Sequence, residues 1–512
     1  MKKELQLLTL ILLAFPTMAL SQNTIVLKAG NAKTKINKEI YGHFAEHLGH
    51  CIYGGIFVGT TSSIPNTKGY RNDVVKALKE MSIPMLRWPG GCFADTYHWK
   101  DGIGKPSERP SIVNVHWGGV TEDNSFGTHE FLDYCELIGA EPYISLNVGS
   151  GTVKEASEWV EYVTSDVESP MTNLRKQNGR EKPWNVKYWG MGNETWGCGG
   201  NMRPEYYADL FRQFGSYTRA PHMYRIASGA NSDDYNWTEV LLKYTAKLQW
   251  MIQGTTLHYY TVCHNWDKKG SATQFDEKEW YTTMRKTLFM EELVNKHSQI
   301  MDKYDPKKNV ALVVDEWGNW FDVEPGTNPG FLYQQNSLRD AVVAGINLNI
   351  FNNHADRVKI ANVAQMVNVL QSVILTKEDQ MVLTPTYYVF KMFKVHHDAT
   401  LIPIVLQSEL IDVDGTKIKA INASASVKDG VINLSLCNLS TSKSIKINCR
   451  IEGANTQSAT GEIITSANIN DYNDFGQPEK VNIKEFTGFK LEKSNLSIEL
   501  PAKSVVTIRI KT

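Results

Sequence analysis

Two glutamates stand directly after apolar segments that have the composition of buried strands. Glu194 follows the aromatic segment 186–189 and a Gly-Met-Gly turn, and Glu316 follows the apolar segment 310–314. The two are 122 positions apart (316 − 194), which corresponds to about three βα units of roughly 30 to 40 residues each. Two carboxyl groups that meet across one rim of a sheet are the machinery of glycoside hydrolysis.

The residues beside these glutamates admit simpler roles. Asn193 and Glu194 could cap the N-terminus of a helix, where short polar and acidic side chains are favoured. Asp315 precedes Glu316, and strand alternation directs neighbouring side chains to opposite faces of a sheet. We therefore expect Asp315 to be a structural carboxylate behind the rim, and Glu316 to face the pocket.

The pattern of the chain predicts an α/β fold with a (β/α)8 TIM barrel in residues 39–390. Short apolar segments alternate with segments of helical periodicity, and parallel strands of such barrels carry the chemistry at their C-terminal rim. The long Gly-, Pro- and Trp-rich segment 93–128 is expected to be a functional loop. The expected strands are residues 40–49, 85–92, 141–149, 186–189, 226–229, 254–260, 310–314 and 358–367.

A second domain is predicted in residues 391–512. From about residue 400, short segments alternate between apolar and polar residues and are separated by polar turns, which is typical of an antiparallel β-sandwich. The boundary is expected near residue 390, within or just after a helix over 387–395. The expected strands are residues 417–423, 431–438, 444–451, 496–500 and 504–510.

The first 21 residues have the composition of a secretory signal peptide. Lys2 and Lys3 precede a mainly apolar run, and small residues stand at the cleavage position, so Gln22 would become the new N-terminus. The run is too short to predict a membrane span. These features predict a secreted or periplasmic protein.

The amino-acid composition indicates which classes of ligand the protein could bind. With 54 basic and 55 acidic residues, the net charge of −1 gives no electrostatic case for binding nucleic acid. The 13 tryptophans and 22 tyrosines suit a sugar-binding protein, although most could be core residues. No zinc, iron–sulfur or nucleotide motif is present, so neither a metal site nor a cofactor is predicted.

The seven cysteines are an odd number, so at least one must be unpaired. Cys437 and Cys449 lie in neighbouring strand-like segments and could pair. For most of the others, free buried thiols are expected, because a core of this size does not need disulfides.

The chain resembles the α-L-arabinofuranosidases of glycoside hydrolase family 51 over nearly its whole length after residue 21. An Asn-Glu pair alone is shared by many barrel hydrolases, whereas an ordered set of motifs is far more specific. The motifs are Phe-Ala-Glu-His-Leu-Gly (44–49), Arg-Trp-Pro-Gly-Gly (87–91), Asp-Gly-Ile-Gly (101–104), Gly-Asn-Glu (192–194), Leu-His-Tyr-Tyr (257–260), Asp-Glu-Trp (315–317) and Ala-Gln-Met-Val-Asn (364–368).

This resemblance implies a barrel followed by a jelly-roll-like sandwich, to which residues 22–38 add one or two strands. It implies a retaining mechanism with Glu194 as acid/base and Glu316 as nucleophile. The expected reaction is release of terminal non-reducing arabinofuranose from arabinan, arabinoxylan or arabino-oligosaccharides, so the expected partner is an arabinose-containing plant cell-wall glycan. Members of the family often form trimers or hexamers, which implies a homo-oligomer.

The resemblance also implies a sugar pocket around Glu46, Asn193, Tyr260 and Gln365. Cys92 stands at a substrate-binding position where part of the family has asparagine. A thiol is a weak hydrogen-bond partner, so a contact there would pass through the backbone or be lost.

Other rim residues could act in the site or simply support it. Arg87 could hold Glu316 in its charged form, and could equally form a structural salt bridge. Tyr260 could donate to Glu316 or be a core residue. His258 is a candidate binding residue, although a histidine at a strand end, like His47, is as often structural. Candidate pocket walls that could also be core are Trp99, Trp117, Trp196, Trp317 and Trp320.

Two other functions remain open from the sequence. The same barrel could carry a β-glycanase or a xylosidase. Alternatively, the protein could bind carbohydrate without catalysis, although the presence of both Glu194 and Glu316 counts against this.

Overall fold

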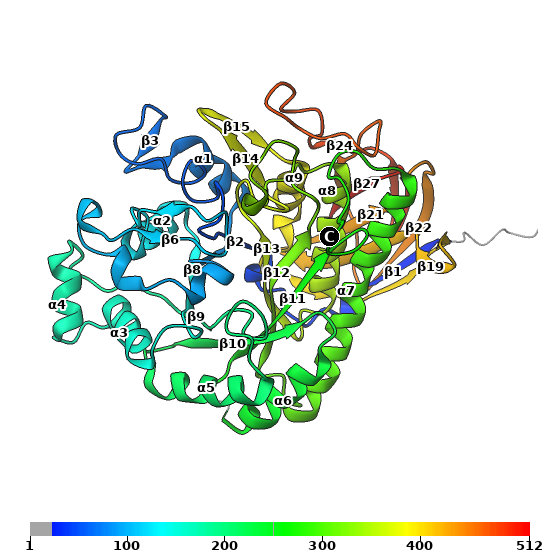
Figure 1. Ribbon diagram of the computed structural model, residues 1–512. Helices are drawn as coiled ribbons and strands as arrows, with labels where there is room; N and C mark the ends of the chain where they lie inside the picture. Colours follow the sequence, from blue (N-terminus) through cyan, green and yellow to red (C-terminus); the bar gives the residue numbers. More distant parts are fainter. Residues whose placement is uncertain (1–22, 249) are drawn as a thin grey trace, which may run out of the picture.

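The computed structural model describes residues 23–248 and 250–512, and Figure 1 shows how they are arranged. The predicted signal peptide, residues 1–21, lies outside the described residues. Among the helices that are described, none is both long enough and apolar enough to cross a membrane.

Within the described residues, eight parallel strands form a closed barrel, as predicted. The last strand pairs with the first, so the sheet has no open edge. Glu194 follows the fourth strand and Glu316 lies in the seventh. In barrel order the strands are β2 (Gly42–Phe44), β5 (Met85–Trp88), β8 (Glu141–Leu146), β9 (Tyr188–Met191), β10 (Tyr224–Asn231), β11 (Gly254–Thr261), β12 (Ala311–Asn319) and β13 (Val358–Ala364).

Helices surround the barrel, and most of them bury an apolar stripe (Figure 1). In α1, for example, Val74, Val75, Leu78 and Met81 are buried on one face. The helices that follow the barrel strands are α1 (Asn72–Met81), α2 (Thr128–Ile138), α3 (Val153–Thr164), α4 (Pro170–Gln177), α5 (Pro204–Tyr217), α6 (Tyr235–Thr245), α7 (Glu277–Tyr304), α8 (Leu338–Asn353) and α9 (Pro385–Phe393).

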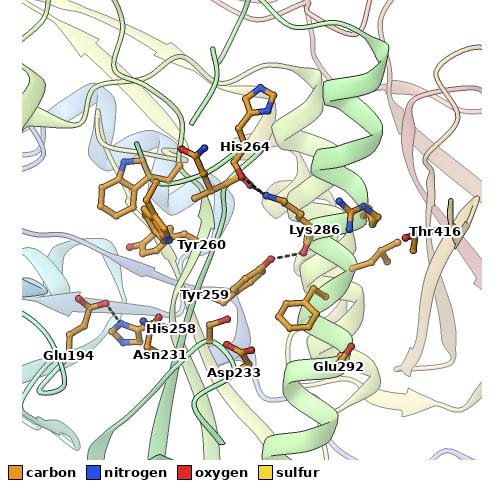
Figure 2. Close-up of a pocket in the computed structure, with 18 of the residues that line it drawn as sticks. Glu194, Asn231, Asp233, His258, Tyr259, Tyr260, His264, Lys286, Glu292 and Thr416 are labelled. Atoms are coloured by element: carbon orange, nitrogen blue, oxygen red, sulfur yellow. Dashed lines mark hydrogen bonds and ion pairs between the residues drawn. The ribbon is translucent and has the colours of Figure 1, made fainter. Parts of the chain in front are cut away.

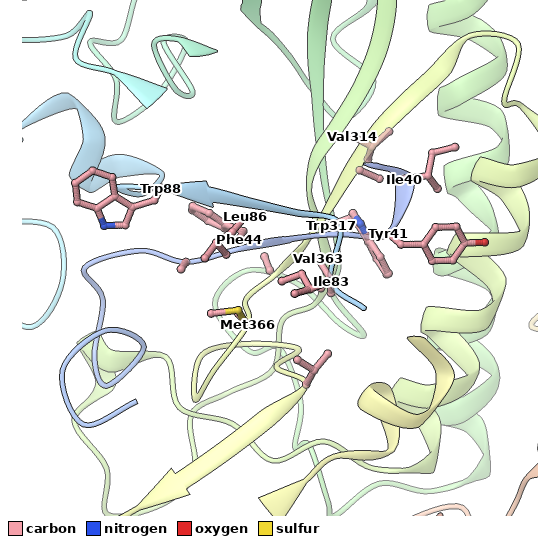
Figure 3. Packing of buried hydrophobic residues seen from close by; sticks show 14 of the residues in the cluster. Ile40, Tyr41, Phe44, Ile83, Leu86, Trp88, Val314, Trp317, Val363 and Met366 are labelled. Carbon is pink, nitrogen blue, oxygen red and sulfur yellow. The ribbon is translucent and has the colours of Figure 1, made fainter. Parts of the chain in front are cut away.

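The barrel wall separates two apolar layers. Leu86, Val314 and Val363 belong to the large hydrophobic cluster outside the strands, where Trp317 stacks on Phe390 (Figure 3). A smaller buried cluster comes from the alternate strand positions, which place their side chains inside the barrel. Its members are Met85, Tyr143, Tyr188, Ile226, Ala311, Val313 and Ile360. This inner layer forms the base on which the polar rim residues stand.

The C-terminal domain is built from two sheets that pack face to face. Among the described residues, one sheet has the order β17-β1-β22-β26-β25 and the other β16-β20-β21-β27-β23-β24. Apolar side chains from both sheets form a separate core. The strands are β1 (Thr24–Lys28), β16 (Thr400–Ile402), β17 (Ile404–Gln407), β20 (Ile421–Lys428), β21 (Val431–Asn438), β22 (Ile445–Glu452), β23 (Ser458–Ile464), β24 (Lys484–Glu485), β25 (Phe489–Glu492), β26 (Asn495–Leu500) and β27 (Ser504–Lys511).

Strand β1 lies inside the first sheet. It pairs antiparallel with β17 and parallel with β22, so the start of the described chain is held between two strands from its far end. Helix α8 forms the junction between barrel and sandwich. It is buried on nearly all sides, and Asn349 and Asn352 bond with Asn422 and Ser424 of β20.

Residues 417–423 do not form the single strand that the sequence suggested. They are divided between β19 (Thr416–Lys419) and β20, and β19 pairs with β18 (Leu410–Val413) in a separate hairpin. Asp414 and Gly415 have φ values of 51° and 81° at its tip, which is the backbone that a tight Asp-Gly hairpin turn requires. The hairpin leaves the sandwich and contacts α7, where Lys278 pairs with Asp414 at 3.4 Å.

The suggested pairing of Cys437 with Cys449 is wrong. Both are free buried thiols, because β21 and β22 belong to different sheets. Cys437 faces Asn349 of α8, whereas Cys449 faces the core between the sheets. The described cysteines outside this pair include one disulfide, which lies at the barrel rim.

Candidate active site

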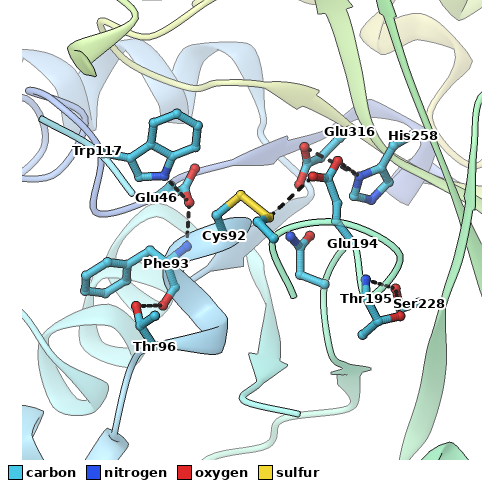
Figure 4. Close-up of a disulfide and its surroundings, with 12 residues drawn as sticks. Glu46, Cys92, Phe93, Thr96, Trp117, Glu194, Thr195, Ser228, His258 and Glu316 are labelled. Carbon is cyan, nitrogen blue, oxygen red and sulfur yellow. Dashed lines mark hydrogen bonds and ion pairs between the residues drawn. A yellow bond between two sulfur atoms is a disulfide. The ribbon is translucent and has the colours of Figure 1, made fainter. Parts of the chain in front are cut away.

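Glu194 and Glu316 lie together at the C-terminal rim of the barrel, as the strand order requires (Figure 4). The chain turns sharply before Glu194. Gly192 has a φ of 88° and Glu194 itself a φ of 39°, in the left-handed region that side chains rarely adopt outside functional sites. The turn brings the Glu194 carboxyl group back over the barrel instead of along a helix axis.

Three side chains fix the Glu316 carboxylate. Arg87 Nη1 donates to one oxygen at 2.9 Å and Tyr260 Oη to the other at 2.8 Å. His258 Nδ1 lies 3.5 Å from that second oxygen. The contacts foreseen for Arg87 and Tyr260 are therefore present. Charge-assisted bonds of this kind favour the ionised, correctly oriented form that a nucleophile needs.

Glu194 is held in a different way. One oxygen lies 2.8 Å from His258 Nδ1 and the other 3.6 Å from Cys198 Sγ. Burial and the charge of Glu316 raise the pKa of Glu194, although His258 opposes the shift. One oxygen each of Glu194 and Glu316 and a nitrogen of His258 lie within 4.8 Å of one another. The site thus contains one carboxyl group suited to carry a proton beside one suited to carry a charge.

His258 links the carboxyl groups and does not itself face the sugar pocket. Nδ1 contacts Glu194, and Nε2 lies 3.0 Å from Asp315. Burial would lower the pKa of His258, but the charges of Glu316 and Asp315 outweigh it and raise the pKa to about 10. Both ring nitrogens are therefore engaged by carboxylates, and the ring also lines the open cavity beside Glu194.

Asp315 has structural contacts, but the expectation that its side chain points to the opposite face of the sheet from Glu316 was wrong. Its carboxylate accepts from Tyr143 Oη at 2.8 Å and lies 3.3 Å from Arg87 Nε, inside the barrel. The pairing of β12 with β13 slips between Val314 and Trp317. Such a bulge places consecutive side chains on one face. Asp315 and Glu316 therefore both point inward, one below the other.

A pocket for one small ring opens beside Glu316. Glu46 is buried at its floor and accepts from the Phe93 backbone N at 3.0 Å and from Trp117 Nε1 at 2.9 Å. Gln365 Nε2 donates to the other Glu46 oxygen at 3.0 Å. Burial and the charge of Glu316 raise the pKa of Glu46 to about 7.

One atom of each of two amide side chains beside this pocket has no hydrogen-bond partner among the described residues. Arg87 donates to Asn193 Oδ1, whereas the buried Asn193 Nδ2 is free to donate. Gln365 donates to Glu46, whereas its buried Oε1 is free to accept. Both atoms could therefore bond with hydroxyl groups of a substrate. A Cβ added at Gly91 would lie 3.0 Å from Glu316 Oε1 and 3.5 Å from Asn193 Nδ2, which shows how little space the wall leaves.

Cys92 forms a disulfide with Cys198, so it has no thiol to donate. The bond joins the loop after β5 to the loop after β9 and lines the pocket beside Glu194 (Figure 4). Among the described residues, three clusters have metal-ligand spacing. One is closed by this disulfide and another is the Glu194–His258–Glu316 group, whose carboxylates already share a charged imidazole.

Some of the candidate tryptophans lie at the rim and others lie in the core. Trp117, Trp196 and Trp320 line cavities at the rim, whereas Trp99 and Trp317 are almost fully buried in the core. No motif or periodicity in the sequence indicated Leu332 and Leu370, apolar loop residues that complete the pocket wall. His47 is structural: it accepts from Trp88 Nε1 at 3.1 Å and stacks on Phe93.

Replacing His258 with glutamine is expected to move the alkaline limb of the kcat/KM profile to higher pH. Glu194 must be protonated to act as acid, and the positive imidazole lowers the pKa of Glu194. Loss of that charge lets the pKa of Glu194 rise, so activity persists to higher pH. The profile is measured on an aryl arabinofuranoside.

The control for this variant is His98→Gln, a change at an exposed histidine paired with Glu155 outside the site. It should leave both limbs in place. An alkaline limb that stays fixed in His258→Gln would show that His258 does not set the protonation of Glu194.

A closed (β/α)8 barrel with two carboxyl groups meeting at its rim defines a glycoside hydrolase. A family model described as the α-L-arabinofuranosidase C-terminal domain matches residues 315–504, and one described as the α-L-arabinofuranosidase 1 domain matches residues 77–279. The chain belongs to the α-L-arabinofuranosidases of glycoside hydrolase family 51.

Known arabinofuranosidases are similar to this protein over nearly the whole chain. An intracellular exo-α-L-arabinofuranosidase of Bacteroides ovatus is 53% identical, with 100% of both chains covered. The crystal structure of a family 51 arabinofuranosidase from Xanthomonas axonopodis pv. citri is 49% identical, with a TM-score of 0.94 over 96% of this chain and 100% of that one. An arabinose complex of the Thermotoga maritima α-L-arabinofuranosidase is 29% identical, with a TM-score of 0.84 and the same coverage.

The expectation of a secreted or periplasmic protein is contradicted. The Bacteroides ovatus relative, which aligns with the entire chain, is named an intracellular enzyme. The expectation rested on the charge, the apolar run and the small cleavage-site residues within the first 21 positions, and these properties do not by themselves determine export.

Proposed function

We propose that this enzyme is a retaining, exo-acting α-L-arabinofuranosidase that works by double displacement. The proposal rests on one observation: an oxygen of Glu194 and an oxygen of Glu316 lie within 4.8 Å of each other. Retaining enzymes place their carboxyl groups about 5 to 5.5 Å apart, whereas inverting enzymes need roughly 6.5 to 9.5 Å to admit a water.

In the first step, a Glu316 oxygen attacks the anomeric carbon while Glu194 gives its proton to the leaving oxygen. The glycosidic bond breaks and an ester to Glu316 forms. The charge of Glu316 is then gone, so the pKa of Glu194 falls. In the second step, Glu194 takes a proton from water and the water oxygen attacks the anomeric carbon. The ester bond to Glu316 breaks, which restores the Glu316 carboxylate, and free arabinose leaves.

The pocket residues suit the hydroxyl groups of the sugar. Asn193 Nδ2 is free to donate to the 2-hydroxyl, a bond that strengthens in the transition state. Glu46 and Gln365 would hold the hydroxyls farther from the reacting carbon. Cys92 contributes the disulfide as an apolar wall, and Arg87 acts through Glu316 and Asn193.

The shapes of two cavities support exo action. The inner pocket, of about 40 Å³, is lined by Glu46, Trp117, Leu332 and Leu370. It adjoins an open cavity of about 1120 Å³, and Glu194, Tyr260 and Trp320 line both. A single terminal sugar would occupy the inner pocket, and the scissile bond would lie at the junction beside Glu194. A glycanase that cuts within a chain would need an inner pocket open at both ends.

The proposed substrates are arabinan, arabinoxylan and arabino-oligosaccharides with terminal non-reducing arabinofuranose. The exo-acting relative and the arabinose complex of a second relative support this class.

Trapping with methanol tests the stereochemistry. With p-nitrophenyl α-L-arabinofuranoside and methanol as acceptor, the transfer product is expected to be the methyl α-arabinofuranoside, which NMR identifies. A methyl glycoside cannot change its anomeric configuration in water, so the result is unambiguous. Methyl β-arabinofuranoside, or no methyl glycoside beside rapid hydrolysis, would contradict double displacement.

A further inference from the structure

The open cavity beside Glu194 extends far beyond the catalytic carboxyl groups. Its volume of about 1120 Å³ exceeds the range of roughly 300 to 1,000 Å³ found for small-ligand sites. Its lining runs from Glu194 past Tyr259 and along α7 to Thr416 and Ile418. In Figure 2, Glu194 and Thr416 lie on opposite sides of the view with Tyr259 between them.

Aromatic side chains line the part nearest the reacting bond. Trp266 is 58% exposed, and its ring meets that of Trp320 edge to face at 5.4 Å. Trp196 and Tyr259 also belong to the lining. Large exposed aromatic surfaces beside a catalytic group mark ligand-binding grooves. The loop that carries Trp266 is anchored because Lys286 donates to the backbone oxygens of residues 262 and 264 at 2.8 and 2.7 Å.

Polar groups of both signs line the middle of the groove. Arg285 lines it from α7, and its Nε is buried without a partner in the described part of the chain. Asp233 is exposed on the same lining. Lys286 and Glu292 add one further charge of each sign. Two positive and two negative groups give no net preference for a charged ligand, but they suit hydroxyl groups that both donate and accept.

The far end of the groove is supplied by the C-terminal domain. Thr416 and Ile418, two residues apart in β19, face the cavity, and Lys417 between them points to the other face. The β18–β19 hairpin has no place in either sandwich sheet. Its ion pair with Lys278 fixes it against the helix that forms the groove wall.

We infer that this groove binds the leaving-group part of the substrate over several sugar residues, and that the β18–β19 hairpin forms its distal subsite. The occupant is a neutral pentose chain, because the lining charges balance and Glu194, which must protonate the leaving oxygen, stands at the groove entrance. The inference rests on the proposed function and adds to it a preference for long leaving groups.

The test compares a p-nitrophenyl α-L-arabinofuranoside with α-1,5-arabino-oligosaccharides of two to six residues, using the full-length enzyme. In the wild type, kcat/KM should rise with chain length until the distal subsite is filled. In Thr416→Trp, the ratio of kcat/KM for the hexasaccharide to that for the disaccharide should fall about fivefold, as expected for loss of one or two contacts. Activity on the aryl substrate should stay within about twofold.

Matched controls separate groove contacts from general damage. Lys417→Trp places the same bulk on the opposite face of the hairpin and should leave the length dependence intact. Arg285→Ala should reduce the length dependence, whereas Gln299→Ala, at an exposed position of α7 outside the groove, should not.

Equal length dependence in Thr416→Trp and Lys417→Trp would overturn the inference, as would an equal loss on every substrate. Wild-type enzyme that cleaves the aryl substrate and the disaccharide but shows no gain with length would overturn the inference and leave the proposed function standing. Failure to cleave the aryl arabinofuranoside would contradict both the proposed function and the inference.

Discussion

Replacing Glu316 with alanine is expected to lower kcat on p-nitrophenyl α-L-arabinofuranoside by at least about 10⁴-fold, because no covalent intermediate can form. Arg87 and Tyr260 would lose the group that they hold at 2.9 and 2.8 Å, but the closed barrel should remain. Steady-state kinetics give the loss, and circular dichroism and the melting temperature confirm the fold.

Rescue by azide tests whether Glu316 acts as the nucleophile. In Glu316→Ala the anion can occupy the space of the missing carboxylate and attack the anomeric carbon directly. The product should then be the β-arabinofuranosyl azide, with a configuration opposite to that of the substrate. Glu168→Ala, at an exposed site remote from the rim, should keep full activity. If Glu316→Ala kept more than a few per cent of wild-type turnover, another residue would have to be the nucleophile.

Replacing Glu194 with alanine is expected to have an effect that depends on the leaving group. General acid catalysis contributes about 10²- to 10⁴-fold, so hydrolysis of arabinobiose, whose sugar alkoxide is a poor leaving group, should fall within that range. Formation of the ester from a dinitrophenyl arabinofuranoside, which needs no proton, should be nearly normal. A burst of dinitrophenol followed by slow turnover would show that the ester forms normally and that its hydrolysis, which needs Glu194 as base, is the step that slows.

The same variant carries two further signatures. Azide should restore turnover and yield the α-arabinofuranosyl azide, since it attacks the ester from the face where Glu194 normally activates water. The alkaline limb of the pH profile should disappear, because the group whose pKa burial and Glu316 raise is absent. Equal losses on the dinitrophenyl substrate and on arabinobiose would exclude Glu194 as the general acid.

Much of the barrel could be predicted because its signals are local. Buried parallel strands are continuous apolar runs, and the spacing of Glu194 and Glu316 places them on the fourth and seventh of those runs. The contact of Tyr260 with Glu316 followed from its position at the end of the neighbouring strand β11, whereas Arg87 reaches Glu316 across the barrel from β5, which is not a neighbour of β12.

Features that depend on irregular backbone could not be predicted. The inward direction of Asp315 results from a bulge that only the pairing of β12 with β13 reveals. The disulfide joins Cys92 and Cys198 across 106 positions through loops whose course has no periodicity. The sequence predicts β19 and β20 as one strand because both have the same alternating pattern and only Ala420 lies between them. The pairing of β19 with β18 across the Asp-Gly turn is what separates it from β20.

Strand β1 has a consequence for how the polypeptide is made. Its partner β22 ends 424 positions later in the chain (452 − 28). At synthesis rates of about 5 to 20 residues per second, roughly 20 to 85 seconds pass between the synthesis of β1 and that of its complete partner. Throughout this interval the nascent chain must keep an apolar strand from pairing elsewhere, and this sheet can close only after β22 has been made.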